Sequence, residues 1–115
     1  MEAVSNHLAT YQKIVQDLLS DYAKVKPANG DFEVQTIFDT ERNHYQIVHL
    51  GWQSKRWVHH CTIHLDIRDG KIWIFKNSTE HAIEEDLMNL DVPKTDIVLG
   101  FVPAQIRAMT GYGVV

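Results

Sequence analysis

Several ingredients of common protein classes are scarce in this sequence of 115 residues. It has one cysteine, Cys61, so no disulfide can form within the chain, and this thiol lies in an apolar strand pattern that fits a reducing compartment. No stretch approaches the roughly 20 apolar residues that a membrane-spanning helix needs. The N-terminus also lacks the cationic and apolar segments of a secretory signal. We therefore expect a cytoplasmic protein that does not enter a membrane.

Positive charge is scarce as well. The formal net charge is −4, with 11 Lys and Arg against 15 Asp and Glu, and the basic residues are spread along the chain without forming a block. Affinity for nucleic acid depends mainly on basic side chains that neutralise phosphates. Direct nucleic-acid binding by the chain alone is therefore disfavoured.

Apolar residues are plentiful, at 44% of the chain. A protein of this length buries roughly two-thirds of its unfolded surface around one core, so we expect a single domain over residues 1–115. Residues 4–25 carry an apolar or aromatic side chain every three or four positions, which predicts a helix with one apolar face. A coiled coil of three heptads is the alternative for this segment.

The apolar period changes to two after the first helix, which predicts strands at 33–39, 44–52, 56–68 and 71–76. Short loops between them imply an antiparallel meander. The firmest turn is Asp69-Gly70, which favours a type I′ hairpin because both of its central residues need positive φ. This turn would pair Leu65 with Ile74 and His64 with Phe75.

A second helix is expected to begin at Asn77 or Ser78, whose side chains suit a helix N-cap. Residues 97–101 are either a fifth short strand or a buried extended segment. The predicted fold class is therefore α+β, a four-stranded antiparallel meander with helices packed on one face.

Side-chain alternation divides the predicted sheet into two faces. Apolar residues such as Cys61, Ile63 and Leu65 share the face that we expect to form the core. Two helices cover about one face of a four-stranded sheet, so the opposite face should be open or covered by another protein. Aromatic residues ringed by polar ones are typical of interfaces, although exposed aromatics also occur singly on ordinary surfaces. The candidate protein interface comprises Arg56, His60, Thr62, His64, Trp73 and Phe75.

A candidate polar patch lies at the turn before the second strand. Its residues are Asp39, Glu41, Arg42 and His44. Such residue types occur in metal-assisted hydrolases and nucleases, but no phosphate loop or nucleophile elbow accompanies them. A structural role is favoured, in which Asp39 caps the turn and Arg42 pairs with an acid. We predict no catalytic residue.

The seven histidines do not show the spacing of a known metal motif. His60 and His64 lie on one strand about 13 Å apart, too far for a single ion with bonds of about 2 Å. His49 could approach from the adjacent strand but is expected to be buried. No metal and no cofactor are predicted.

Taken together, several motifs resemble the XisI family, the fdxN element excision controlling factor proteins of cyanobacteria. The resemblance covers residues 11–107 and is carried by Asp39–Trp52, Gly70–Ile74, Ser78-Thr79-Glu80, Val92–Phe101 and Arg107. Asp91 departs from the glycine that this resemblance leads us to expect before Val92-Pro93.

The resemblance implies a non-catalytic regulatory protein that acts through protein contacts. Proteins of this kind are described as working with a companion, XisH, and a site-specific recombinase, XisF, in the programmed excision of a DNA element in heterocysts. The implied partners are an XisH-like protein and a site-specific recombinase, and a homo-oligomer is a further option. A weak DNA-binding module is an alternative that requires one continuous basic surface, made by Arg42, Lys55, Arg56, Arg68 and Lys71.

Overall fold

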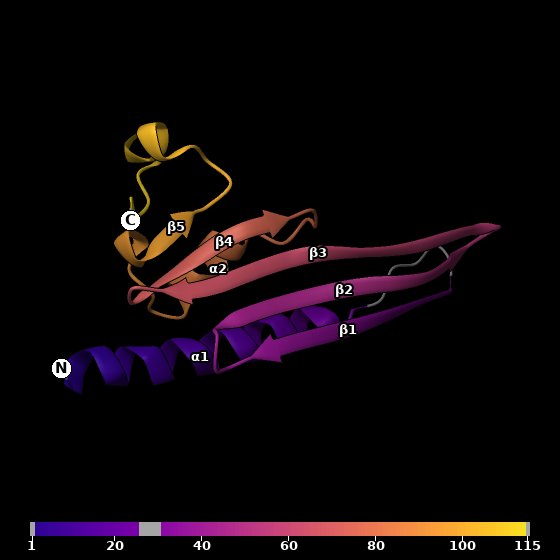
Figure 1. Ribbon diagram of the computed structural model, residues 1–115, viewed down its shortest axis with the longest axis horizontal. Coiled ribbons are helices and arrows are strands. Elements are labelled where there is room, and N and C mark those ends of the chain that lie inside the picture. Colours follow the sequence, from indigo (N-terminus) through magenta and orange to yellow (C-terminus); the bar gives the residue numbers. More distant parts are fainter. Residues whose placement is uncertain (1, 26–30, 115) are drawn as a thin grey trace.

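The computed structural model describes residues 2–25 and 31–114, with the side chains described from residue 7 onward. Its centre is a five-stranded sheet in which the strands follow one another in sequence order (Figure 1). The first four strands form the predicted antiparallel meander, whereas the fifth pairs with the fourth in parallel. The strands are β1 (Asp31–Asp39), β2 (His44–Gln53), β3 (Arg56–Arg68), β4 (Lys71–Asn77) and β5 (Ile97–Leu99).

Two α-helices, α1 (Glu2–Ala23) and α2 (Ile83–Asn89), pack on one face of the sheet. The apolar stripe of α1 is buried against β1 to β3, so this helix covers the sheet and the coiled-coil alternative is wrong. The core combines Tyr11, Val15 and Leu19 from α1 with Ile83 and Leu87 from α2. Among the described residues, none of the helices combines the length and the apolar character required to cross a membrane.

Helix α2 begins later than predicted. The side chain of Asn77 does not cap the helix, because its Oδ1 accepts hydrogen bonds from the backbone N–H and the hydroxyl of Thr79. The helix is followed by Asp91 at φ 69°, a left-handed conformation that aspartate tolerates better than most residues. Asp91 follows the C-cap Leu90, a position where a left-handed glycine is common, and here the family resemblance predicted a glycine.

The Asp69-Gly70 turn has φ values of 53° and 74°, as a type I′ hairpin requires. The predicted pairing of Leu65 with Ile74 is confirmed. The pairing of His64 with Phe75 is wrong, because a β-bulge lets His64 pair with Lys76. Phe75 is the extra residue at this bulge.

A second bulge, between β2 and β3, reverses part of the predicted face assignment. Ile47 pairs with Ile63 and Val48 pairs with Cys61, which leaves Thr62 as the extra residue. Thr62 and the residues before it in β3 therefore point to the faces opposite to those predicted. His60 and Thr62 lie on the helix side of the sheet, and Cys61 lies on the other side, across from Val48.

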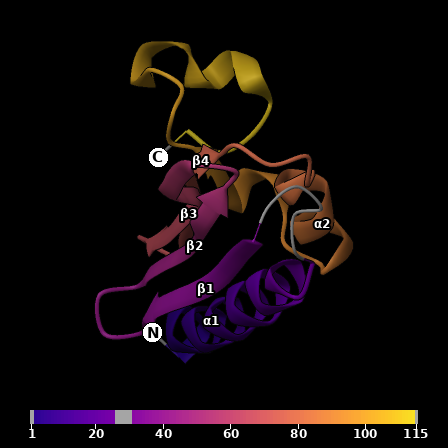
Figure 2. The same ribbon diagram turned by 90° about the vertical axis from the view of Figure 1, so that its right-hand side faces the viewer.

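The sheet face opposite α1 was predicted to be open or covered by another protein, and this is wrong near β4, where the chain itself covers it. The C-terminal segment, residues 100–114, returns over it and includes the 3₁₀ helix η2 (Ala104–Thr110) (Figure 2). A shorter 3₁₀ helix, η1 (Lys94–Asp96), connects α2 to β5. The guanidinium of Arg107 lies 5.1 Å from the centre of the Trp73 ring, which is only 8% exposed. The backbone N–H of Gly113 donates to the carbonyl of Ile97 at 2.7 Å, so the chain end is also held to the sheet.

The hairpin of β2 and β3 extends beyond the end of α1 as an arm (Figure 1). This arm, residues 50–59, contributes to the long dimension of a molecule that measures 51 × 30 × 24 Å. At its base Gly51 has φ 150°, and a Cβ atom there would lie 2.1 Å from the carbonyl oxygen of Asp31. Glycine thus allows β1 to run close beside the arm.

Candidate functional site

The predicted polar patch closes a turn. Asp39 Oδ1 accepts the backbone N–H groups of Glu41 and Arg42 at 3.0 Å each, and its Oδ2 pairs with Arg42 Nη1 at 3.0 Å. These bonds, first that from the Arg42 backbone, lower the pKa of the Asp39 carboxyl. His44 lies opposite Asp39 in the strand ladder, but its ring bonds elsewhere. Within residues 7–25 and 31–114, no side-chain hydrogen bond joins Asp39 or Glu41 to His44.

His44 instead belongs to a cluster that spans β2 and β3. His44 Nδ1 and His64 Nε2 each lie 2.8 Å from the same oxygen, Oδ1 of Asp66. The other oxygen of Asp66 accepts from Arg68 Nε at 3.0 Å and from Arg68 Nη2 at 2.9 Å. We call His44, His64, Asp66 and Arg68 the carboxylate cluster.

Burial and charge act in opposite directions on the central carboxyl. Asp66 is only 1% exposed, and this burial alone would raise its pKa. The hydrogen bonds from His44, His64 and Arg68 together outweigh it, so the pKa of Asp66 lies below its usual value. The cluster therefore contains a buried carboxylate whose two oxygens both take part in hydrogen bonds. Its two histidines are partly exposed, so the cluster is in contact with solvent.

Aromatic rings flank this cluster on the same face. Arg68 lies 4.8 Å from the centre of the Phe75 ring, which also stacks with Trp73 at 5.9 Å and lies 5.4 Å from His64. Three members of the predicted interface, His64, Trp73 and Phe75, are thus brought together. The prediction is wrong that His60 and Thr62 share their face.

His60 and Thr62 join a separate group on the helix side. His49 Nδ1 lies 2.9 Å from Thr62 Oγ1, and the rings of His49 and His60 stack at 6.4 Å. Burial first, and then the neighbouring His60, lower the pKa of His49. A cavity of about 50 Å³ beside them is lined by both helix-layer and sheet residues, too small for most ligands.

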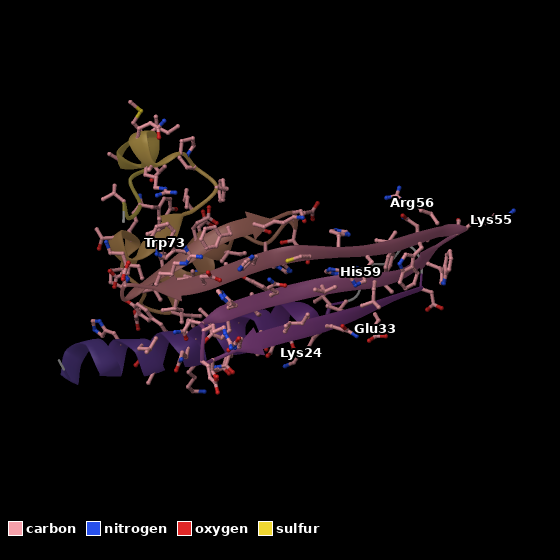
Figure 3. The ribbon with its side chains drawn as sticks, in the orientation of Figure 1. Lys24, Glu33, Lys55, Arg56, His59 and Trp73 are labelled. Atoms are coloured by element: carbon pink, nitrogen blue, oxygen red, sulfur yellow. The ribbon has the colours of Figure 1, made fainter. Side chains whose placement is uncertain are left out.

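The remaining member of the predicted interface, Arg56, lies on the arm (Figure 3). Two indoles are exposed there: Trp52 is 54% exposed and Trp57 is 50% exposed. They are cross-strand partners with ring centres 5.3 Å apart in an edge-to-face arrangement. We call Trp52 and Trp57 the indole pair.

Sequence reasoning missed both the carboxylate cluster and the indole pair. If the pairing of Gln53 with Arg56 continued without a bulge, His44 would face Leu65 on the core side instead of Asp66. The His64-x-Asp66 spacing was a usable signal, because residues two apart in a strand share a face. The bulge at Thr62 brings His44 opposite Asp66, and no feature of the sequence indicates this bulge.

The sequence and fold of this chain are similar to those of known proteins. The family model for "XisI protein" matches residues 5–114. A XisI-like protein from Anabaena variabilis ATCC 29413, solved by crystallography at 1.30 Å resolution, is 46% identical; the alignment covers 94% of this chain and 99% of that chain, with a TM-score of 0.87. The fdxN element excision controlling factor XisI from the same organism is 30% identical, with 95% and 99% coverage and a TM-score of 0.80. No curated protein sequence matches.

Proposed function

The chain belongs to the XisI protein family, and on this premise we propose that it is a non-catalytic controlling factor of DNA-element excision that acts by binding another protein through its arm. An XisH-like protein is the proposed direct partner, and a site-specific recombinase is the enzyme whose action the complex would control.

The observation that carries this proposal is the indole pair. Tryptophan is enriched among interface residues that contribute most to binding, because its large ring buries much area at a small entropic cost. Both rings belong to the β2–β3 hairpin, which projects past the end of α1 (Figure 1), so a partner can reach them without contacting the helices. Arg56 and Lys55 at the tip would add a charged rim.

The layout of the basic residues supports a protein partner over DNA. Lys55 and Arg56 lie at the arm tip, whereas Arg68 is at the other end of β3, about 40 Å away at the usual rise per residue. Arg42 and Arg68 are also paired with Asp39 and Asp66. The basic residues that the DNA-binding alternative requires therefore do not form one continuous surface.

The test is co-purification and affinity measurement with an XisH-like protein. Replacing the indole pair by serine, W52S/W57S, should weaken the complex by about 2 kcal/mol or more, roughly 30-fold, if both rings act as hot spots. The matched control is Phe101→Ser, because Phe101 is 58% exposed but lies in the C-terminal segment.

Circular dichroism should show that both variants remain folded, since all three rings are at least half exposed. Equal affinities for the wild type, W52S/W57S and F101S would refute the role of the arm. A parallel titration with duplex DNA at about 0.15 M salt, the physiological ionic strength, should show only weak binding. Submicromolar binding of DNA without a partner would favour the DNA-binding alternative instead.

A further inference from the structure

We propose that His44, His64 and Asp66 form a binding site for a divalent transition-metal ion of the zinc type. The three residues supply one ligand atom each: Nδ1 of His44, Nε2 of His64 and a carboxylate oxygen of Asp66. These atoms all lie within 4.8 Å of one another. The site lies outside the arm, and it is independent of the proposed function.

The separations between the ligand atoms suit a small ion. A tetrahedral ion with bonds of about 2.0 to 2.1 Å holds its ligand atoms about 3.3 Å apart. Each histidine nitrogen is 2.8 Å from Asp66 Oδ1, and the separations reach at most 4.8 Å. The two imidazoles are partly exposed, and they would have to rotate to place all three atoms around one ion.

The donor set selects the class of metal. Two imidazole nitrogens and one carboxylate oxygen suit zinc, iron(II), cobalt(II) and nickel(II), whereas magnesium and calcium prefer oxygen ligands alone. Three protein ligands leave at least one coordination position for water. His44 and His64 have side chains that are 45% and 30% exposed, so an ion and its water can enter from solvent.

The surroundings hold the carboxylate in place for this task. Asp66 lies in the middle of a sheet, directly opposite His44 on β2 and Trp73 on β4. Arg68 binds the oxygen that faces away from the two histidines, and the Trp73 indole N–H in turn donates to the backbone carbonyl of Arg68 at 3.3 Å. Hydrogen bonds of this kind orient ligating carboxylates in metalloproteins. The positive charge of Arg68 lowers the affinity for a cation. Asp66 is the one negatively charged residue among the three ligands, so it offsets this charge only once.

A hydrogen-bonded cluster without metal would account for the same distances, and the two possibilities differ in a measurable way. Binding of an ion displaces the protons that the imidazole nitrogens share with Asp66 and replaces them by coordination bonds. The nitrogen resonances of both rings then change together and saturate at one ion per chain. In a purely hydrogen-bonded cluster, added metal leaves them unchanged.

The experiment uses the full chain without a histidine tag. Zn²⁺ is titrated by calorimetry, Co²⁺ by its visible absorption, and the histidine ring nitrogens are followed by NMR during the Zn²⁺ titration. We expect one ion per chain, tetrahedral Co²⁺ absorption, and shifts at Nδ1 of His44 and Nε2 of His64. His44→Gln and His64→Gln should each weaken Zn²⁺ binding at least about tenfold.

Two controls address other histidines. His59→Gln alters an exposed histidine of the arm (Figure 3), and H49Q/H60Q removes the stacked histidine pair on the helix side. Both should bind Zn²⁺ like the wild type. The proposal is overturned if no 1:1 binding occurs, if the double variant H44Q/H64Q binds as well as the wild type, or if H49Q/H60Q alone abolishes binding. Circular dichroism confirms that each variant is folded before it is compared.

Discussion

At the scale of single residues, the four tyrosines share one electrostatic property. The pKa of each of Tyr11, Tyr22, Tyr45 and Tyr112 is raised, with burial as the largest cause. For Tyr11 and Tyr22 the next cause is the hydrogen bond that each hydroxyl donates to an aspartate, Asp96 and Asp86 respectively. The neutral phenol is therefore the form that the folded protein stabilises.

This property predicts a loss of stability at alkaline pH. A pKa that is higher in the folded state contributes stability that is complete below the unfolded value of about 10 and is lost as pH rises through the folded value. The free energy of unfolding should therefore fall above about pH 10 as the unfolded tyrosines ionise. Ultraviolet absorbance of phenolate, measured against pH in native and urea-unfolded protein, checks this. Ionisation of all four tyrosines near pH 10 in the native protein would contradict the prediction.

Residue burial was predictable from the sequence only where local alternation decides it. Alternation correctly placed Trp73 on the face opposite Ile72 and Ile74. It could not indicate that Arg107, 34 positions later in the chain, returns to cover that ring, because such a contact depends on the path of the C-terminal segment. The guanidinium is also tied to its own segment, because Arg107 Nε donates to the carbonyl of Val102 at 2.9 Å.

At the scale of elements, the contact between α1 and α2 depends on Tyr22. Its hydroxyl donates to Asp86 and its ring stacks on His81 with 3.8 Å between ring centres. Tyr22→Phe keeps the ring and removes a hydrogen bond to a charged acceptor, so it should lower the free energy of unfolding by about 1 to 2 kcal/mol. Urea unfolding measures this loss. Tyr112→Phe is the control, because the Tyr112 hydroxyl has no hydrogen bond within residues 7–25 and 31–114, and a loss as large as that of Tyr22→Phe would refute the assignment.

The pairing of the start of β1 with β2 requires the missing side chain of Gly51. Gly51→Ala introduces a Cβ atom against the backbone of Asp31 in addition to an unfavourable φ. Gly70→Ala also meets a positive φ, but its Cβ would have nothing within 4 Å. A left-handed conformation costs an alanine about 1 to 2 kcal/mol, so G70A should lose about that much and G51A at least about 1 kcal/mol more. Equal losses in thermal unfolding would show that the strand moves aside without cost.

The extent of each strand was predictable, but the two bulges were not. Turn residues and the period of two place all four meander strands within two residues of their observed ends. A bulge adds one residue to a strand, and the alternation of apolar and polar residues changes too little for the bulge to be detected from the sequence. The bulge at Thr62 moves His60 and Thr62 to the helix side and brings His44 to Asp66. The candidate site was therefore only half predictable, since it depends on register and not on strand assignment.

At the scale of the whole molecule, the core and the arm are distinct parts. The radius of gyration is 15.1 Å, compared with about 13 Å for an average compact domain of this length. Every core residue lies outside residues 50–59. The arm therefore adds length and exposed indole surface without adding to the core.

This division predicts that the arm can be removed without unfolding the protein. His49 and His60 are cross-strand partners, so residues 50–59 can be replaced by an Asn-Gly type I′ turn that joins them directly. The shortened chain should unfold cooperatively and show a smaller radius of gyration by small-angle scattering, because the core is intact and only the distal end of β1 loses its pairing. The shortened chain should also fail to bind the XisH-like partner. W52S/W57S should lose the same binding while its radius of gyration stays that of the wild type. A shortened chain that is folded and still binds the partner would place the contact on the body of the protein, whereas an unfolded one would show that the arm is required for the fold.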